Sequence, residues 1–497
     1  MEVAHPLNSK PAHLPVIVGA LLTTAFALQI LLLNSFTGAS IYLLSSEAFL
    51  LVGAGTLLWA LIHRRSLLDD PIYLAVFSYV IFIGIGPLVG SLGGVPLAVT
   101  ASPESTACSW FAFAALVCGC WSARLTRSRR GTQQAPASLA REFRWGTMKR
   151  AGIVYTLVGL VAIAFYLQTV GWTDYLLYAS YATRGSVSGY YTTPLGLLRP
   201  GFFLLLAWAT ARKKVPLGWT VALAAYCVLD LLWFGPIRGS RHHIITFVLT
   251  ALYLTKQSIA WRARPRFRAI PATWVVALGL TLVFVWGGLR VYTLSQIRED
   301  QGRRDTYGDV QGAAFSSLYS PYDTYARIVD ATPNFVPFLM GSSISESLTV
   351  LVPRDLWPSK PEPLGDWLSI TFYGVQPWVA NTVPTWPGEC YLNFGLAGLL
   401  AGMFAMGALC AWLALWSKAA SGGCGISPPR ILLYGVTFPL IFDMMHEGSN
   451  GAVWFLFTNT LPVCAAIWLA RRHSAHTRAN VASRVEGEKR IAEFARI

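Results

Sequence analysis

Apolar stretches of roughly 18–22 residues, separated by short polar segments, recur along the whole chain. An α-helix needs about 20 apolar residues to cross the roughly 30 Å hydrocarbon core of a bilayer. The pattern therefore predicts an all-α polytopic membrane protein with about twelve transmembrane helices. The predicted spans lie at about 14–33, 41–62, 71–91, 104–122, 152–171, 195–211, 216–234, 242–257, 272–290, 388–417, 431–446 and 452–470.

The spacing of the spans also predicts the domain organisation. We expect a membrane domain with nine spans over 1–290 and a second membrane segment with three spans over 388–470. Between them, 291–387 is predicted to be one large outer loop that contains short helices, because it is rich in aromatic residues, Pro and Gly. A long loop beside short ones is usually functional or disordered, and the aromatic content of this one argues against disorder. The last segment, 471–497, is predicted to be a cytoplasmic tail.

Composition agrees with a membrane protein. Hydrophobic residues make up 54% of the chain and charged residues 13%, about half the usual charged share of a soluble domain. This excludes a soluble enzyme, a fibrous protein and a disordered one. The eight cysteines do not resemble a disulfide framework, although Cys108 and Cys390 are both predicted near the outer surface, where they could pair.

The net charge of +15 has an explanation in topology. With both termini in the cytoplasm, 28 of the 39 Lys and Arg residues fall in inner segments and 11 in outer ones, as expected when short cytoplasmic loops collect basic residues. The outer charges run against this preference and are therefore the candidates for function. Within the spans, ionisable residues are predicted in the outer third of several helices and indicate a polar chamber open to the outer leaflet; they are Glu47, Arg199, Asp230, Arg290 and Asp443.

The first candidate motif is the outer turn Gly235–His243, which leads into a span. Arg238 and Arg241 precede or begin a helix, where free N–H groups and the helix dipole favour an anion. Arginine also grips phosphate oxygens through two parallel hydrogen bonds. An ordinary interfacial turn is the alternative interpretation.

Two further motifs follow later in the chain, one Pro-rich and one at the start of a predicted span. In and directly after Pro353–Pro361, prolines at 353, 358, 361 and 363 stiffen the backbone. Arg354, Trp357 and Lys360 are placed to contact a phosphate or a sugar. In Gly388–Gly398, which opens a span, Glu389 and Asn393 are four residues apart and share one helical face. The later segment Asp443–Glu447 is predicted as an outer turn, in which His446 would titrate near neutral pH.

These motifs carry a family resemblance. The sequence PRDLWPSKP, then PGECYLNFGLAG at the start of a late span, preceded by a GSR turn before an earlier span, resembles the bacterial oligosaccharide repeat-unit polymerases, the Wzy-type O-antigen and exopolysaccharide polymerases. The resemblance implies a lipid-linked glycosyltransferase of GT-C-like architecture in the bacterial inner membrane. The donor would be a glycan on undecaprenyl pyrophosphate, the acceptor a single lipid-linked repeat unit, and a chain-length regulator a partner; no nucleic acid is implied.

That chemistry assigns roles to the candidates. Preorganised cations would stabilise the pyrophosphate leaving group, so we expect Arg238, Arg241, Arg290 and Arg354 to bind it, with Arg298 and Lys360 behind them. A carboxylate or His would accept the proton of the attacking hydroxyl. Glu389 is the first candidate and His446 the second, although a structural cap would suit the position of Glu389 equally well. We expect no metal and no cofactor.

Other functions stay open at this point. An O-antigen ligase would use the same outer-leaflet donor and the same arginines. A transporter or flippase is a rival of another class, and it is disfavoured because no repeat relates the two halves of the chain. A structural membrane subunit would leave the outer arginines unexplained.

Overall fold

The structure, a computed structural model, describes most of the helical part of the chain: residues 39–62, 70–92, 102–128, 145–170, 196–211, 216–234, 241–256, 310–349, 352, 356–374, 382–421 and 428–471. Within these ranges the fold is all-α, with fourteen α-helices, two short π-helices and no sheet. In chain order the elements are α2 (Ala39–Ile62), α3 (Pro71–Tyr79), η1 (Val80–Gly84), α4 (Gly86–Leu92), α5 (Pro103–Ser128), α6 (Trp145–Val170), α9 (Leu198–Thr210), α10 (Leu217–Phe234), α11 (Arg241–Lys256), α14 (Val310–Ala331), α15 (Ser342–Leu348), α16 (Leu364–Tyr373), α17 (Trp386–Ser421), α18 (Pro428–Thr437), α19 (Leu440–Phe455) and η6 (Leu456–Thr460).

Four helical segments in the described ranges are long and apolar enough to cross a membrane. They are Pro103–Ala123, Trp145–Thr169, Trp386–Trp416 and Leu440–Arg471, and they indicate a multi-pass membrane protein. The predicted spans at 41–62, 104–122, 152–171 and 388–417 correspond to α2, α5, α6 and α17. The predicted spans at 14–33 and 272–290 lie outside the described residues.

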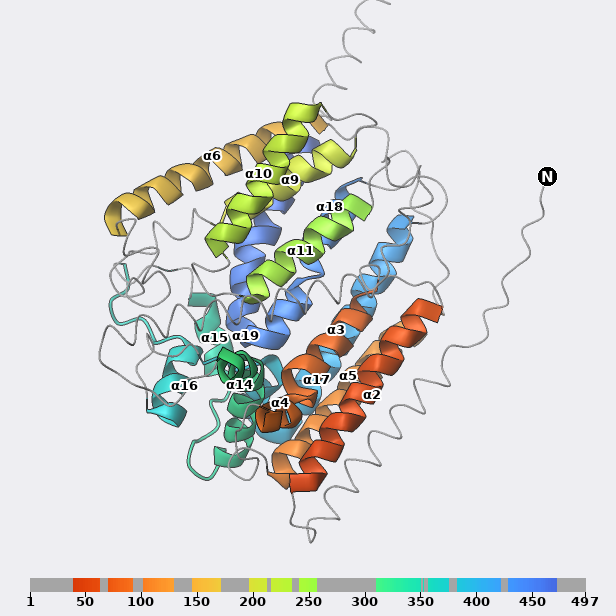
Figure 1. The fold of residues 1–497 in the computed structure, drawn as a ribbon, viewed down its shortest axis with the longest axis vertical. Coiled ribbons are helices and arrows are strands. Elements are labelled where there is room, and N and C mark those ends of the chain that lie inside the picture. Colours follow the sequence, from red (N-terminus) through yellow and green to blue (C-terminus); the bar gives the residue numbers. More distant parts are fainter. Residues whose placement is uncertain are drawn as a thin grey trace, which may run out of the picture.

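Helices α5 and α17 run side by side through the molecule (Figure 1). Their backbones approach closely because each helix has a glycine at the crossing. A Cβ atom on Gly119 would lie 2.0 Å from the carbonyl oxygen of Phe404, and one on Gly407 would lie 2.0 Å from that of Leu116. Small residues at helix crossings are the usual means of close packing between membrane helices.

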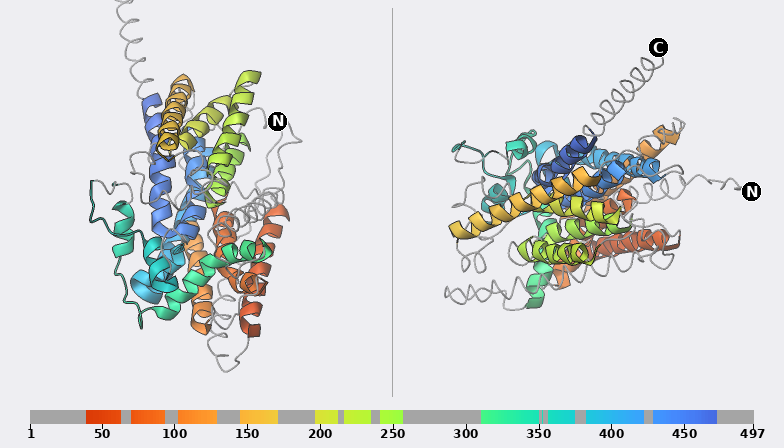
Figure 2. Two further views of the ribbon diagram at one scale, coloured as in Figure 1. Left: turned by 60° about the vertical axis from the view of Figure 1, so that its left-hand side comes forward. Right: turned by 90° about the horizontal axis from the view of Figure 1, so that it is seen from above.

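The segment predicted as a large loop takes part in the main core. Tyr322 and Tyr325 of α14 are 1% and 0% exposed and belong to the same hydrophobic cluster as α2 to α6, α9 to α11 and α17 to α19. Helices α14, α15 and α16 gather at the lower left of Figure 1, and the left view of Figure 2 places them again at the lower end. The predicted short helices are therefore present, but they are packed against the bundle rather than detached from it.

The segment Asp443–Glu447 is a correction to the sequence analysis, because it is helical rather than a turn. The break comes directly after it, at Gly448. Contact between α18 and η6 requires the chain to double back between them, since the 19 residues from Thr437 to Leu456 would span about 28 Å along a straight helix. Cys108 and Cys390 are both free thiols, so the possible bridge between them is not formed.

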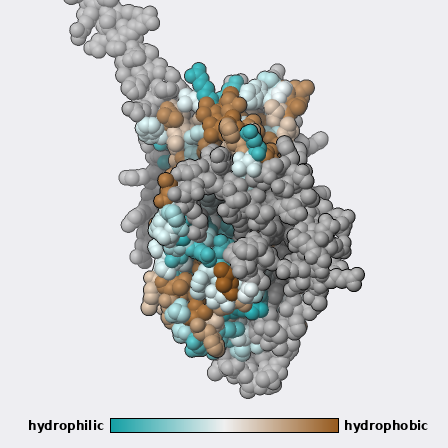
Figure 3. All heavy atoms as spheres, turned by 90° about the vertical axis from the view of Figure 1, so that its left-hand side faces the viewer, coloured by the Kyte–Doolittle hydropathy of each residue, from teal (hydrophilic) through white to brown (hydrophobic). Residues whose placement is uncertain are grey.

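Exposed apolar side chains show which helices would contact lipid. On α6 and α10, Val161, Phe165 and Val221 are more than half exposed. On the face drawn in Figure 3, brown atoms gather at the height of α6, whereas teal and white atoms mix with brown ones lower down, at the height of α14 to α16. Apolar surface of this kind is stable only in contact with lipid or another apolar surface.

Candidate functional site

The site begins at the first turn of α17. The side chain of Thr385 accepts a hydrogen bond from the Gly388 N–H (3.2 Å) and its carbonyl accepts one from the Glu389 N–H (2.9 Å). Thr385 is therefore the N-cap of α17. Pro387, in the first turn, has no N–H to satisfy, so the sequence Thr-Trp-Pro-Gly starts the helix with few unpaired donors.

The Glu389 carboxylate, only 1% exposed, binds to a different helix. Its Oε2 accepts the Ser449 N–H at 2.6 Å, and its Oε1 accepts the hydroxyls of Ser449 at 2.5 Å and Ser343 at 2.9 Å. Ser449 is the first residue after the break in α19, where a helix N-terminus presents free N–H groups and a partial positive charge. Glu389 thus caps the second half of α19 and not its own helix.

Asn393, one turn after Glu389, completes this arrangement. Its Nδ2 donates to the Ser343 hydroxyl (2.7 Å) and to the Glu389 carbonyl (2.8 Å), and its Oδ1 accepts the Gly341 N–H (2.8 Å). Ser343 therefore accepts from Asn393 and donates to Glu389. The predicted common face of Glu389 and Asn393 is confirmed, and both side chains lie on the start of α15.

Helix α15 supplies two of the hydroxyls. Ser343 and Ser347 are four residues apart, so both lie on one face of the helix. The Ser347 hydroxyl lies 2.5 Å from the Ser449 hydroxyl. We call Glu389, Asn393, Ser343, Ser347 and Ser449 the Glu389 network; all five are buried. A buried polar cluster is stable only when its members pair in this way.

Two glycine breaks flank the Glu389 network. Gly395 in α17 has φ 61° and ψ −150°, and Gly448 in α19 has φ 69° and ψ −150°. This backbone conformation is accessible essentially only to glycine. At Gly448 a Cβ atom would also lie 2.3 Å from Glu389 Oε2. Both long helices are therefore broken. The Glu389 side chain on α17 binds the residue that follows the break in α19.

The helix that follows the Pro-rich motif, α16, lies against the same part of α17. Its Leu364 and Leu368 pack in one cluster with Leu392 and Ile328, so the chain directly after the second predicted motif meets the third. Trp357 is 39% exposed and donates from Nε1 to the Ser359 hydroxyl at 3.0 Å.

Lys360, in the same motif, forms a hydrogen bond to the backbone at the start of this segment. Its Nζ donates to the Val352 carbonyl at 3.0 Å. Arg354 lies outside the described residues.

The first motif is described only from the start of α11, whose first residue is Arg241. Near the other end of this helix, Tyr253 packs on Tyr434 and Phe438 at 4.9 and 5.6 Å between ring centres. Helix α11 contacts both α18 and α19. Its last turns pack on α18 through Tyr253, and its first turn is the end that lies nearer to α19 in Figure 1. The side chain of Arg241, and Arg238, Arg290 and Arg298, lie outside the described part.

The remaining predicted ionisable residues do not share one environment. His446 packs against Phe82 with 4.8 Å between ring centres. Asp443 is fully buried, and Arg199 is 5% exposed with its guanidinium 5.7 Å from the Phe247 ring centre. Glu47 is exposed, and the side chain of Asp230 lies outside the description. Of the residues predicted to form the polar chamber, Arg199 and Asp443 are therefore buried, whereas Glu47 is not.

Sequence reasoning missed a second polar cluster, between α14 and α16. The Tyr373 hydroxyl donates to Asp323 Oδ2 at 2.7 Å, and Arg327 Nε donates to the same oxygen at 3.1 Å. Burial and the neighbouring Asp323 carboxylate raise the pKa of Tyr373, so the phenol stays protonated and serves as a donor. The signal was present as Asp323 and Arg327 at helical spacing, but the partner Tyr373 is 50 residues away.

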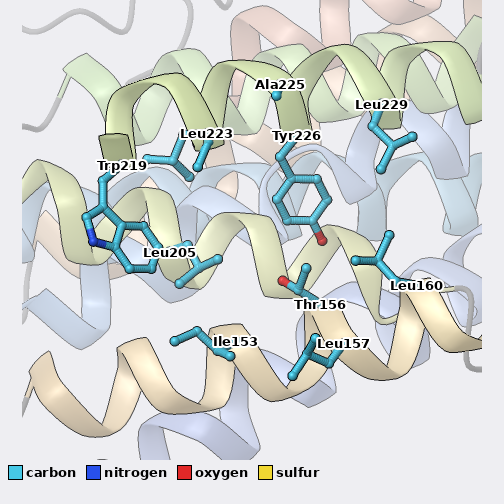
Figure 4. A pocket seen from close by; sticks show the side chains of 11 residues that line it. Ile153, Thr156, Leu157, Leu160, Leu205, Trp219, Leu223, Ala225, Tyr226 and Leu229 are labelled. Carbon is cyan, nitrogen blue, oxygen red and sulfur yellow. The ribbon is translucent and has the colours of Figure 1, made fainter. Parts of the chain in front are cut away.

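A cavity of about 360 Å³ lies elsewhere, between α6, α9 and α10 (Figure 4). Its lining is almost wholly apolar, and none of the predicted site residues contributes to it. It is therefore separate from the Glu389 network.

One comparison with known proteins gives a match to this part of the chain. A family model described as a domain of unknown function, DUF8712, matches residues 313–459. This range runs from α14 to η6 and contains all five residues of the Glu389 network. No curated protein and no solved structure matches the chain.

Proposed function

We propose that the protein is a polymerase that joins undecaprenyl-pyrophosphate-linked oligosaccharide repeat units into O-antigen or exopolysaccharide. In this proposal it has about twelve spans in a GT-C-like architecture, lies in the bacterial inner membrane with both termini in the cytoplasm, and acts at the outer leaflet. A chain-length regulator is a candidate partner.

One observation supports this proposal above the others. Segments far apart in sequence meet at one end of the helical bundle. They are α16, which follows the Pro-rich motif and packs through Leu364 and Leu368, the start of α17 through Glu389, and the break in α19 through Ser449. The Arg241 end of α11 points to the same helix. Two of these segments, the start of α17 and the start of α11, carry the resemblance to repeat-unit polymerases, and α16 directly follows the third segment that carries it.

The proposed reaction transfers a glycan from a pyrophosphate to a hydroxyl. The acceptor hydroxyl oxygen bonds to the anomeric carbon of the donor, the bond from that carbon to the pyrophosphate oxygen breaks, and undecaprenyl pyrophosphate leaves. Arg238, Arg241, Arg290 and Arg354 would neutralise the charge that develops on the leaving group.

Glu389 enters the proposal as a positioning residue. Its carboxylate already accepts three hydrogen bonds and is 1% exposed, which leaves little access for a substrate hydroxyl. A general base must come within about 3 Å of the proton it removes. His446, two residues before the break in α19, is therefore the better candidate, and strong leaving-group stabilisation by arginines would reduce the need for a base.

A transporter is a second candidate because α17 and α19 are broken helices, which transporters commonly use at their binding sites. There, the N-terminus of a half-helix points to an anionic substrate. Here the N-terminus after Gly448 is occupied by the protein's own Glu389. This favours a fixed joint over a ligand site and ranks the transporter below the polymerase.

The test is the lipid-linked glycan profile of a strain that lacks the gene, with the wild-type gene restored as control. A polymerase predicts single repeat units accumulated on undecaprenyl pyrophosphate at the outer leaflet. Full-length polymer stranded on the lipid would instead indicate a ligase, and repeat units held at the cytoplasmic leaflet would indicate a flippase. Either of these results would overturn the proposal.

A further inference from the structure

The cavity between α6, α9 and α10 has the shape of a groove with a polar end. On α6 its lining residues Ile153, Thr156, Leu157 and Leu160 follow helical spacing along one face. Lys149 is one turn before Ile153 on the same face. Figure 4 shows Trp219 at one end of the groove and Leu160 and Leu229 at the other.

Lys149 marks the end of the groove at Trp219. Its Nζ lies 4.7 Å from the ring centre of Trp219 and 5.0 Å from that of Trp208. Arg150 follows directly and is exposed. A lysine held between tryptophans beside an exposed arginine is the composition of a membrane interface, where aromatic rings and basic side chains meet lipid headgroups.

The interior of the groove favours hydrocarbon over water. Its two hydroxyls are already used, since Thr156 donates to the Gly152 carbonyl at 2.8 Å and Tyr226 donates to the Leu198 carbonyl. Apolar cavities of about 150 Å³ stay dry and take up small hydrocarbons. The volume of about 360 Å³ here leaves room for a longer chain.

The length of the groove matches one leaflet. The seven-residue step from Ile153 to Leu160 covers about 10 Å, and the ten-residue step from Trp219 to Leu229 covers about 15 Å. Half of a roughly 30 Å hydrocarbon core is about 15 Å. A chain that enters at Lys149 would therefore reach the middle of the bilayer at Leu229.

We propose that this groove binds an anionic glycerophospholipid, with its phosphate at Lys149 and one acyl chain along α6 and α10. Basic pockets between membrane helices recognise anionic headgroups in this manner. In the orientation proposed above, the Lys149 end faces the cytoplasmic leaflet, so the lipid is distinct from the outer-leaflet substrate. The binding itself does not depend on the proposed reaction.

The test uses the full chain reconstituted into nanodiscs of equal parts phosphatidylcholine and phosphatidylglycerol, followed by native mass spectrometry of the lipid retained. Wild type should retain phosphatidylglycerol over phosphatidylcholine by about fivefold, as expected for one lysine near an anionic headgroup. Lys149→Gln should abolish this preference. Arg150→Gln, which removes the same charge from an exposed neighbour, should keep most of it.

A second pair of variants tests the acyl-chain site independently. Ala222 lines the groove, whereas Ala224 is exposed on the opposite side of α10. Ala222→Phe should reduce retention of both lipids by about fivefold or more, and Ala224→Phe should leave it unchanged. Equal retention in these two variants, equal retention of the two lipids by wild type, or displacement of phosphatidylglycerol by added undecaprenyl phosphate would each overturn the proposal.

Discussion

Replacing Glu389 by Gln separates a positioning role from a proton-accepting one. The Ser449 N–H cannot rotate, so the remaining carbonyl oxygen of Gln must take the place of Oε2. The new NH₂ group then faces the hydroxyls of Ser343 and Ser449, which donate to Oε1 in the wild type. Both hydroxyls must turn, although Ser343 already accepts from Asn393.

The size of the effect follows from these contacts. Hydrogen bonds to a charged group contribute about 1.5–3 kcal/mol and neutral ones about 0.5–1.5 kcal/mol. Exchanging three of the first kind for two or three of the second should lower the free energy of unfolding by about 2–4 kcal/mol. Glu389→Ala leaves three buried donors without an acceptor at about 1–3 kcal/mol each, so its loss should be larger still.

The assay is thermal unfolding of purified protein, read beside polymer output per folded molecule. Glu346→Gln on α15 is the matched control, because it makes the same chemical change at a partly exposed carboxylate nearby and should change stability by less than about 0.5 kcal/mol. A positioning residue predicts that Gln lowers the unfolding temperature by several degrees relative to this control. Unchanged stability with turnover down by about 10²–10⁴ would identify Glu389 as the base and refute our reasoning.

Three further predictions follow from the site and the topology. Gly448→Ala should cost at least about 3 kcal/mol in thermal unfolding, through backbone strain and a Cβ atom 2.3 Å from a carboxylate oxygen, whereas Gly55→Ala, with open space around it, should be neutral or stabilising by about 0.5–1 kcal/mol. Arg241→Lys should lose most of the polymer output and Arg241→Ala nearly all, because lysine lacks the forked donor array; full output from Ala would remove Arg241 from the site. Ser345→Cys should react with a membrane-impermeant maleimide from outside intact spheroplasts and Arg150→Cys should not, and the reverse result would invert the proposed orientation.

The length of the apolar stretches predicted several of the long helices from the sequence. Helices α2, α5, α6 and α17 lie where apolar stretches were long and uninterrupted, because burial in lipid demands that length. The shared face of Glu389 and Asn393 also followed from helical spacing alone. Local signals succeed where the determining interaction lies within one or two turns.

Other features depended on contacts distant in sequence. Ser343 and Ser347 lie in Ser-Ser-Ile-Ser-Glu-Ser, which reads as an ordinary polar loop until it is placed against Glu389, 46 residues away from Ser343. Asp443–Glu447 was predicted as a turn because its polar residues interrupt an apolar stretch. It is helical, and the helix breaks only at the next residue, Gly448, whose backbone conformation is accessible essentially only to glycine.

The breaks in α17 and α19 explain why polar residues lie buried between largely apolar helices. A break exposes N–H and carbonyl groups that lipid cannot satisfy, so irregular backbone at membrane depth must be buried in protein. The break at Gly448 meets this demand through the Glu389 carboxylate. The break at Gly395 meets it through the carbonyls of Leu392 and Asn393, which accept the N–H groups of Leu339 and Met340. The Glu389 carboxylate therefore holds the break in α19, and the segment that leads into α15 holds the one in α17. Any active site built from the loops at this end inherits its rigidity from the Glu389 network, so variants of Ser343, Asn393 or Ser449 should affect function through stability first.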